Sequence, residues 1–445
     1  MNMHTLDEME TSRYSSRAVA SAAWHSLFWL AFANAIGVLI AILLLVPALN
    51  RQLGEWTYGR WMMVHMNLEL YGWASLPLVG FLFRVYGADR GPTANWCRPV
   101  LWVWSASLGV GVLSWLSGNS SGKLFLDWSG YARVLFPGAL LVLWLLLVFA
   151  LVGSWRESGS ASVDAWAAKL AGLVVLLAVP FLIYIASGPN TYPPVNPDTG
   201  GPTGASQLES SLAIVAVLLM LPFGIARRKP GKSGIFVAGW IVLIAESILC
   251  VALGRADVSH HRPVQFLSLG SLLIWLPLIP SYYAAFEWHP STRRWRLAFL
   301  WWWGALLVTG WVFFLPGVLD HFKFTDGLVG HSFVAMAGFT SSLLIFVMVQ
   351  LLGEGGWIFN RSRSFYLWNG SVIAYIVLMT MAGWREGFDP TFTIVPGVAR
   401  NVLYTLRLVT GILMLLAALD WLVDASTLLR EPIPAATEAP QEKTA

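Results

Sequence analysis

Long apolar runs recur along this chain, and they constrain its fold more than any other feature. There are twelve of them, near residues 26–49, 60–85, 97–117, 132–153, 165–187, 207–227, 234–254, 264–286, 296–318, 327–352, 364–386 and 400–424. A helix of roughly 20 apolar residues crosses a bilayer. Only elements that satisfy their own backbone hydrogen bonds persist in lipid. The runs therefore predict an all-α, polytopic membrane protein with twelve transmembrane helices.

The composition agrees with this class. Apolar residues make up 57% of the 445 residues, charged residues only 12%, and the mean hydropathy is +0.64. A soluble protein of this length carries far more surface charge. The net charge of +4 is small and comes from loop Lys and Arg, so we expect membrane lipid and no nucleic acid as a partner. Cys97 and Cys250 lie in different spans and form no disulfide or metal motif.

Positive charge is concentrated in alternate loops, which predicts the orientation of the spans. The richer set of loops holds Arg84, Arg90, Arg98, Arg156, Arg227, Arg228, Lys229, Lys232, Arg293, Arg294, Arg296, Arg361 and Arg363. Cytoplasmic loops carry such an excess, so we expect both termini in the cytoplasm. We expect a cytoplasmic tail at 1–25, a membrane domain at 26–425 and a disordered, Pro- and charge-rich cytoplasmic tail at 426–445.

Two histidines stand inside predicted spans. His65 lies on the second and His331 on the tenth, and the predicted topology places both about one turn below the outer face. A polar ring in hydrocarbon is costly, so it faces protein, a ligand or a cofactor. Neutral imidazole is a common axial ligand of haem iron. A structural histidine bonded to a neighbouring helix is the alternative.

Several motifs occur in the same order as in a known family. They are "LVPALNRQLGEWTYGRWMMVHMNLELYGW" at spans 1 and 2, "PPVNPDTGGPTG" before span 6, "TDGLVGHSFVAMAGF" at span 10 and "GVARNVLYTLRLVTGILMLLAALDW" at span 12. Together they resemble subunit I of the haem–copper oxidases, most closely the cytochrome cbb-type branch and the related nitric oxide reductases. The resemblance covers residues 26–425 and implies that family's twelve-helix fold.

The resemblance also assigns roles to the histidines. In the family, a histidine on span 2 and the second of two on span 10 bind a low-spin haem, and the first on span 10 binds a high-spin haem. His65 matches the span-2 ligand and His331 the first span-10 ligand, with Phe333 in place of the second. Positions i and i+2 of a helix point about 200° apart. Three arrangements remain open: a separate haem b at each ring, one haem between both rings, or no haem.

The family's copper ligands are missing. Span 6 has no histidine, and Arg255, Ala256 and Asp257 stand where the family has Gly-Pro-His-His at the end of span 7. The pair His260–His261 follows later, in or near an outer loop. We therefore expect haem b as the cofactor, and we do not expect copper.

Other polar residues within the spans are candidates for supporting roles. Glu69 follows His65 by four residues, on the same helix face, and would orient the ring, carry protons or bond a neighbouring helix. Asn67 fits the family's His-x-Asn motif as a structural residue. Glu246 and Glu209 are candidates for proton or quinone contact. Arg407 would pair with a haem propionate, with the surroundings of Asp420, or with a backbone carbonyl.

The family's function is electron transfer from cytochrome c or quinol to dioxygen or nitric oxide, coupled to protons, in a bacterial-type inner membrane. The missing ligands leave open whether this chain is an enzyme. They favour a haem b subunit that passes electrons, or binds a small gas, alongside other subunits of a respiratory complex. The alternative is a haem-free scaffold or assembly subunit. A transporter fits less well, because no paired Gly/Pro breaks occur in matching halves.

Overall fold

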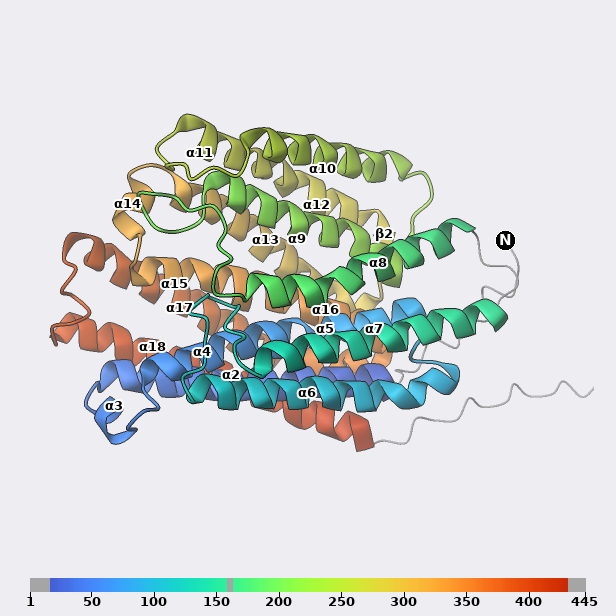
Figure 1. The fold of residues 1–445 in the computed structure, drawn as a ribbon, viewed down its shortest axis with the longest axis horizontal. Coiled ribbons are helices and arrows are strands. Elements are labelled where there is room, and N and C mark those ends of the chain that lie inside the picture. The colour runs from blue at the N-terminus through green and yellow to red at the C-terminus, as the bar shows by residue number, and fades with distance from the viewer. Residues whose placement is uncertain (1–16, 158–162, 431–445) are drawn as a thin grey trace, which may run out of the picture.

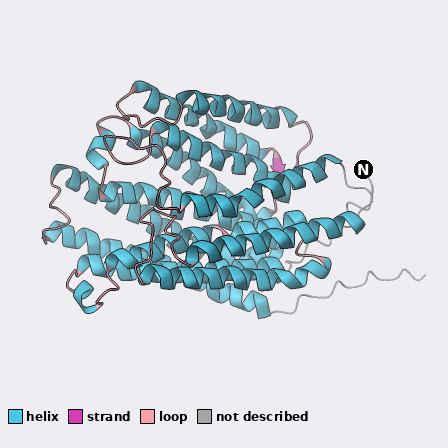
Figure 2. Cartoon of the chain, viewed as in Figure 1, coloured by secondary structure: helices cyan, strands magenta, loops and turns pink. Residues whose placement is uncertain are grey.

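The chain folds into a bundle of long helices that lie roughly along a common direction (Figures 1 and 2). The computed structural model describes residues 17–157 and 163–430. The fold is nearly all-α, with 79% of residues in helices. In the part of the chain described, the one sheet is a two-residue antiparallel pair, β1 (Arg227–Arg228) with β2 (Phe286–Glu287).

Within the described residues, eleven helical stretches are long and apolar enough to cross a membrane. Nine are built on single helices: α2 Arg17–Leu45, α6 Ala94–Leu116, α7 Ala132–Glu157, α8 Val163–Ala186, α9 Gly204–Ile225, α10 Ser233–Leu253, α13 Arg293–Phe314, α17 Ser362–Phe388 and α18 Val398–Arg430. Two are built of consecutive pieces: α11 Pro263–Gly270, η4 Ser271–Ile274 and α12 Trp275–Ala284; and α15 Asp326–Phe333, η6 Val334–Thr340, α16 Ser341–Leu352 and η7 Gly353–Phe359. The short helices are α3 Leu49–Gln52, η3 Gly91–Thr93, η5 Pro290–Thr292 and α14 Val318–Phe322.

The expected span at 60–85 is helical but is not among these eleven, because it is broken. It consists of α4 (Tyr58–Leu68), the π-helical segment η2 (Glu69–Ala74) and α5 (Leu76–Tyr86), with a turn at Ser75. Pro77 near the start of α5 contributes to the break, since proline has no N–H for the helical ladder and its ring crowds the preceding turn.

The other π-helical segment of the described chain is η6, in the expected span 10. The two π segments thus fall on the two helices that carry His65 and His331, and each begins within about one turn of its histidine. π segments are rare and occur often at functional sites. After η6 the chain continues into α16, whose residues are almost all buried. A helix that is apolar all round is one that other helices surround, so α16 lies in the core.

The first and last described helices run antiparallel along each other. The Trp24 indole donates to Ser426 Oγ near one end, and the Arg400 guanidinium donates to the Leu44 carbonyl near the other. The described chain therefore starts and finishes at the same end of the bundle. Strand β2, which pairs with the two arginines of β1, also lies toward that end (Figure 1).

The predicted tail boundaries were wrong. Helix α2 begins at Arg17, well before residue 26, and residues 18–23 are buried. The small side chains of "AVASAA" let this stretch pack closely within the bundle. At the other end, α18 continues to Arg430, so 426–430 is helical rather than tail. The rest of the two predicted tails, 1–16 and 431–445, lies outside the described residues.

Candidate functional site

His65 is held by one ring nitrogen and has the other free. Its Nδ1 lies 2.8 Å from the carbonyl oxygen of Ala33 on α2. A carbonyl only accepts, so Nδ1 carries the proton and donates, and Nε2 keeps its lone pair. Nε2 bonds to no residue that the structure describes, and the side chain is half-buried. A histidine that ligates a metal is commonly fixed in this way, with its second nitrogen donating to a carbonyl.

His331 is arranged similarly against a different helix. Its Nδ1 lies 3.2 Å from Thr309 Oγ1 on α13, and that hydroxyl donates to the Ala305 carbonyl. Because the hydroxyl proton is used there, Thr309 accepts from His331 Nδ1, and Nε2 again keeps its lone pair. No hydrogen bond to Nε2 occurs within the described part of the chain. Phe313 stacks beside the ring, with centroids 5.5 Å apart.

The two histidines share further neighbours at matching positions. Each ring lies against a glycine of the helix that anchors it, Gly37 for His65 and Gly310 for His331. The π segment after each histidine holds a second glycine, seven residues beyond the histidine. This second glycine contacts a tryptophan of the anchoring helix, eight residues before Gly37 or Gly310. These pairs are Gly72 with Trp29 and Gly338 with Trp302. The helix pair α2–α4/η2 therefore repeats the local pattern of α13–α15/η6.

The two rings are anchored on different helices. No hydrogen bond or ring contact joins them in the described chain, and their anchors lie on different helices, α2 and α13. Phe333, which stands where the family has its second span-10 histidine, stacks on Tyr375 of α17 with centroids 3.8 Å apart. His65 and His331 are therefore anchored by different helices, and Phe333 offers no second ligand beside His331.

Glu69 and Asn67 differ in what they contact. Glu69 makes no hydrogen bond or ion pair with any residue that the structure describes, so it does not orient the His65 ring. Its side chain is half-buried at the start of η2. Asn67 is fully buried and donates to Asp127 Oδ2 at 2.9 Å and to the Met63 carbonyl at 2.8 Å. Asn67 is therefore structural, whereas Glu69 is an uncommitted carboxyl one turn from His65.

Arg407 is paired with an acidic residue that the sequence did not single out. Its guanidinium lies 3.4 Å from Asp326 Oδ1, at the first residue of α15, and both side chains are largely buried. Tyr404 also donates to Asp326, at 3.0 Å, and the guanidinium lies over the rings of Tyr375 and Tyr404. The expected alternative near Asp420 is wrong, since Asp420 accepts from Ser364 instead.

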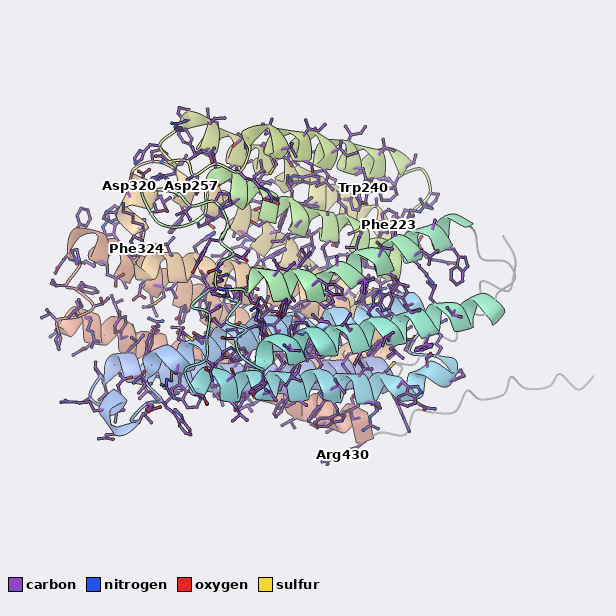
Figure 3. All side chains as sticks on the ribbon, viewed as in Figure 1. Phe223, Trp240, Asp257, Asp320, Phe324 and Arg430 are labelled. Atoms are coloured by element: carbon purple, nitrogen blue, oxygen red, sulfur yellow. The ribbon has the colours of Figure 1, made fainter. Side chains whose placement is uncertain are left out.

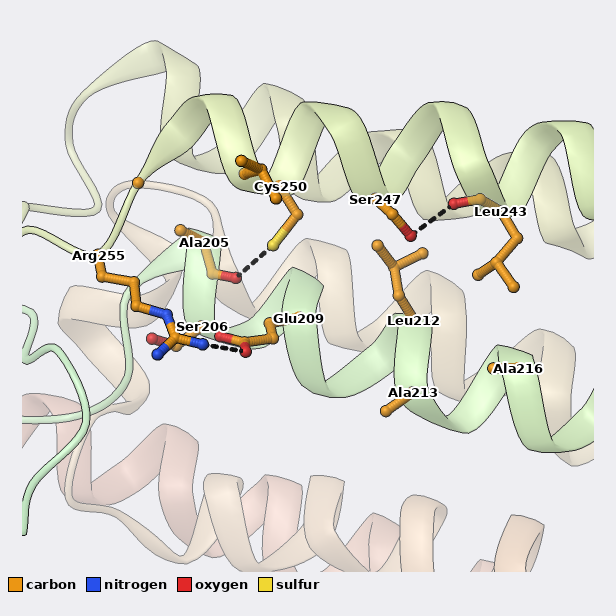
Figure 4. A pocket seen from close by; sticks show the side chains of 12 residues that line it. Ala205, Ser206, Glu209, Leu212, Ala213, Ala216, Leu243, Ser247, Cys250 and Arg255 are labelled. Carbon is orange, nitrogen blue, oxygen red and sulfur yellow. Dashed lines mark hydrogen bonds and ion pairs between the residues drawn. The ribbon is translucent and has the colours of Figure 1, made fainter. Parts of the chain in front are cut away.

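Glu246 and Glu209 lie on spans 7 and 6. Glu246 is buried and accepts from the Trp275 indole at 2.5 Å, and its Oε1 has no partner in the described chain. Glu209 forms an ion pair with Arg255 at 2.8 Å, at the edge of a cavity of about 530 Å³ between α9 and α10 (Figure 4). None of the residues that line this cavity is a histidine.

One buried intramembrane histidine was missed. His25, expected at the membrane surface, lies on α2 with 2% of its surface exposed, and its Nδ1 is 2.9 Å from Ser105 Oγ. The early start of α2 explains this, because it moves residue 25 one or two turns into the helix. No π segment follows His25, so it lacks the pattern that His65 and His331 share.

A second group was also missed, because it forms from three separated loops. His260 is fully buried and lies against Asp198 and Asp320, with its Nδ1 3.4 Å from Asp198 Oδ2 and its Nε2 3.2 Å from Asp320 Oδ1. His261 Nε2 is 3.2 Å from Asp320 Oδ2. Asp320 lies at the end of the bundle that carries α11 and α14 (Figure 3). The pair His260–His261 thus lies in the loop before α11.

Burial sets the protonation of this loop cluster. Burial lowers the pKa of His260, although the carboxylates of Asp320 and Asp198 raise it. Burial alone would raise the pKa of Asp320, but the Gly317 N–H and the charges of His260 and His261 hold it below its usual value. Burial therefore favours the neutral form of His260, while the groups around Asp320 favour the ionised form of its carboxyl.

Comparison with known proteins adds no assignment. No protein-family model matches the chain, and no curated protein matches it either.

Proposed function

We propose that this chain is a multi-pass membrane subunit that binds haem b at His65 and at His331 and passes electrons within a respiratory complex. The observation that carries the proposal is the state of the two imidazoles. In each, Nδ1 is held by an acceptor on a neighbouring helix, and Nε2 has a lone pair with no partner in the described chain. Both side chains are half-buried, and haem iron accepts the lone pair of a neutral imidazole.

The residues around His65 fit a haem better than a purely structural role does. A structural imidazole in lipid uses both nitrogens, because each unmet polar atom is costly there. The Ala33 carbonyl fixes the ring orientation, and Gly37 leaves room for the ring edge. Arg407 is buried and is ion-paired with Asp326 at the start of α15. A bound b-type haem would supply a one-electron redox centre.

The remaining parts of the proposal follow from the resemblance to haem–copper oxidase subunit I. The twelve spans would be the eleven apolar helices plus α4–η2–α5. Both termini would lie in the cytoplasm at a bacterial inner membrane. Cytochrome c or quinol would donate electrons through partner subunits, and copper would be absent from spans 6 and 7.

The experiment is a reduced-minus-oxidised absorption spectrum of the purified chain. We expect a b-type band that weakens in His65→Ala and in His331→Ala and disappears in the double variant. His25→Ala is the matched control, since His25 is also buried in a span, and it should keep the band. A well-folded chain with no band, or a band that survives the double variant, contradicts the proposal.

One observation favours a second candidate, a haem-free scaffold or assembly subunit. Phe333 stacks on Tyr375 where the family has a haem ligand. An aromatic pair of this kind stabilises helix packing without any cofactor. The scaffold function predicts the first of those contrary results, a folded chain without a haem band.

A further inference from the structure

The loop cluster around His260 has a hydrogen-bond pattern that fixes the position of each proton. The backbone N–H of Asp198 donates to Asn196 Oδ1 at 3.1 Å, which turns the Asn196 amide nitrogen toward His260. That nitrogen lies 3.1 Å from His260 Nδ1. An amide N–H only donates, so Nδ1 of His260 carries a lone pair and Nε2 carries the proton.

This arrangement places two acceptors against each other. Nδ1 of His260, which carries no proton, is 3.4 Å from Asp198 Oδ2, a carboxylate oxygen that accepts from the Ser259 hydroxyl. Two electron-rich atoms at this distance repel unless a cation lies between them. Two ligands of one tetrahedral zinc ion, with bonds of about 2.0–2.1 Å, lie about 3.3 Å apart. The observed separation matches that value.

The imidazole of His261 also offers a nitrogen lone pair to a cation. Its Nε2 is 3.2 Å from Asp320 Oδ2, as a proton on Nε2 requires, so Nδ1 of His261 keeps its lone pair. One ligand atom from each of Asp198, His260 and His261 lies within 4.8 Å of the others. Asp320 faces the Nε2 atoms of both rings. Metal-bound histidines are commonly oriented by a carboxylate at the far nitrogen in this way.

A buried polar atom at the cluster lacks a partner. Nε2 of His260 is close to Asp320 but is not aligned for a hydrogen bond, and the side chain has no exposed surface. The ring is therefore not locked by its two carboxylate neighbours. A small rotation of the ring would align Nε2 with Asp320 and bring Nδ1 toward an ion.

We propose that Asp198, His260 and His261 form a zinc-class divalent metal site at the loop end of the bundle, with Asp320 orienting both imidazoles. The ion takes the Nδ1 lone pair of His260 in place of the Asn196 amide, and water completes the tetrahedron. His261 and Asp198 are partly exposed, which gives the ion a path from solution. Lys323, 3.9 Å from Asp320 Oδ1, leaves the outer carboxylate partly neutralised.

The metal site would connect two loops and the short helix α14, which are far apart in the sequence. Asp198 lies in the loop before α9, the two histidines in the loop before α11, and Asp320 in α14. Imidazole ligands favour zinc over magnesium and calcium, which prefer sites made of oxygen atoms. The inference concerns loop residues only and does not depend on haem at His65 or His331.

The test is calorimetric titration of the chelator-treated full chain in detergent with zinc chloride. We expect one saturable site per chain, and no comparable heat with magnesium or calcium. Asp320→Asn should weaken zinc binding roughly 10–100-fold, as loss of an orienting carboxylate does. His261→Ala should weaken it more, because it removes a ligand.

His289→Ala is the matched control. His289 is another histidine close to a carboxylate, Glu354, in the loop between α12 and α13, outside the cluster. Its zinc affinity should equal that of the parent chain. Size-exclusion profiles check that each variant is folded, and Asp320→Asn serves if His261→Ala does not fold. The absence of saturable zinc binding, or equal affinity in His261→Ala and the parent, overturns the site, whatever the haem spectrum shows.

Discussion

The helix pair that carries His65 and the helix pair that carries His331 are built alike, but their surroundings differ. Each pair has an anchored imidazole, a glycine against the ring, a π segment and a glycine–tryptophan contact at the same spacing. On the helix of His65, one turn away, lies the carboxyl of Glu69, which has no partner among the described residues. Near His331 the ring neighbour is the apolar Phe313. The two helix pairs therefore anchor an imidazole in the same way, but the two rings lie in different electrostatic environments.

The largest expected effect comes from breaking the ion pair between Arg407 and Asp326. Arg407→Gln leaves the buried Asp326 carboxylate without its ion-pair partner, and such a loss costs about 3–5 kcal/mol. We expect a decrease of that size in the free energy of unfolding, measured by denaturant titration in mixed micelles. Adding Asp326→Asn to Arg407→Gln should restore part of the loss. An unchanged unfolding free energy in Arg407→Gln would show that the pair is not buried as described.

The likeness of the two π segments is tested by adding a methyl group to each. In Gly72→Ala the new Cβ would lie 2.5 Å from Trp29, and in Gly338→Ala it would lie 2.5 Å from Trp302. Overpacking of this kind costs about 1–3 kcal/mol, so both variants should lose similar stability in the same titration.

Gly109→Ala is the control for these two variants. Gly109 lies within helix α6, and a Cβ there meets nothing within 4 Å. Its unfolding free energy should be close to that of the parent or slightly higher, because alanine favours helix. A large loss at one of Gly72 and Gly338 but not at the other would break the proposed correspondence.

The smallest expected effect separates the two histidine sites. A Cβ at Gly37 would lie 3.0 Å from His65 Cε1, whereas a Cβ at Gly310 would lie 3.5 Å from His331 Cε1, an ordinary contact. Gly37→Ala should push the His65 ring off its preferred angle, at a cost of about 0.5–1.5 kcal/mol. Gly310→Ala should leave His331 in place. Haem retention on gel filtration measures the difference, and equal losses in both variants would argue against it.

The fold class was predictable because the apolar runs report burial in lipid directly. The spacing of histidines within those runs also singled out His65 and His331. The start of α2 was not predictable from hydropathy, since small residues such as Ala18 and Ser21 are buried by close packing rather than by apolar bulk. Sequence alone could pair Arg407 with several partners, and only the helix arrangement selects Asp326.

The loop cluster was beyond sequence reasoning for a different reason. Its acidic members, Asp198 and Asp320, are separated from His260 by whole spans. No local periodicity reports a contact between loops. The adjacent pair His260–His261 was the one available signal, and its likeness to a copper motif drew attention to the membrane interior rather than to the loops.

The most direct test of the central claim is the haem content of the purified chain, measured by pyridine haemochrome per mole of protein. The account predicts one haem b for each of the two anchored histidines, and half of that content in either His65→Ala or His331→Ala. Loss of all haem in each single variant would mean that both rings bind one shared haem. A folded chain without haem would contradict the account.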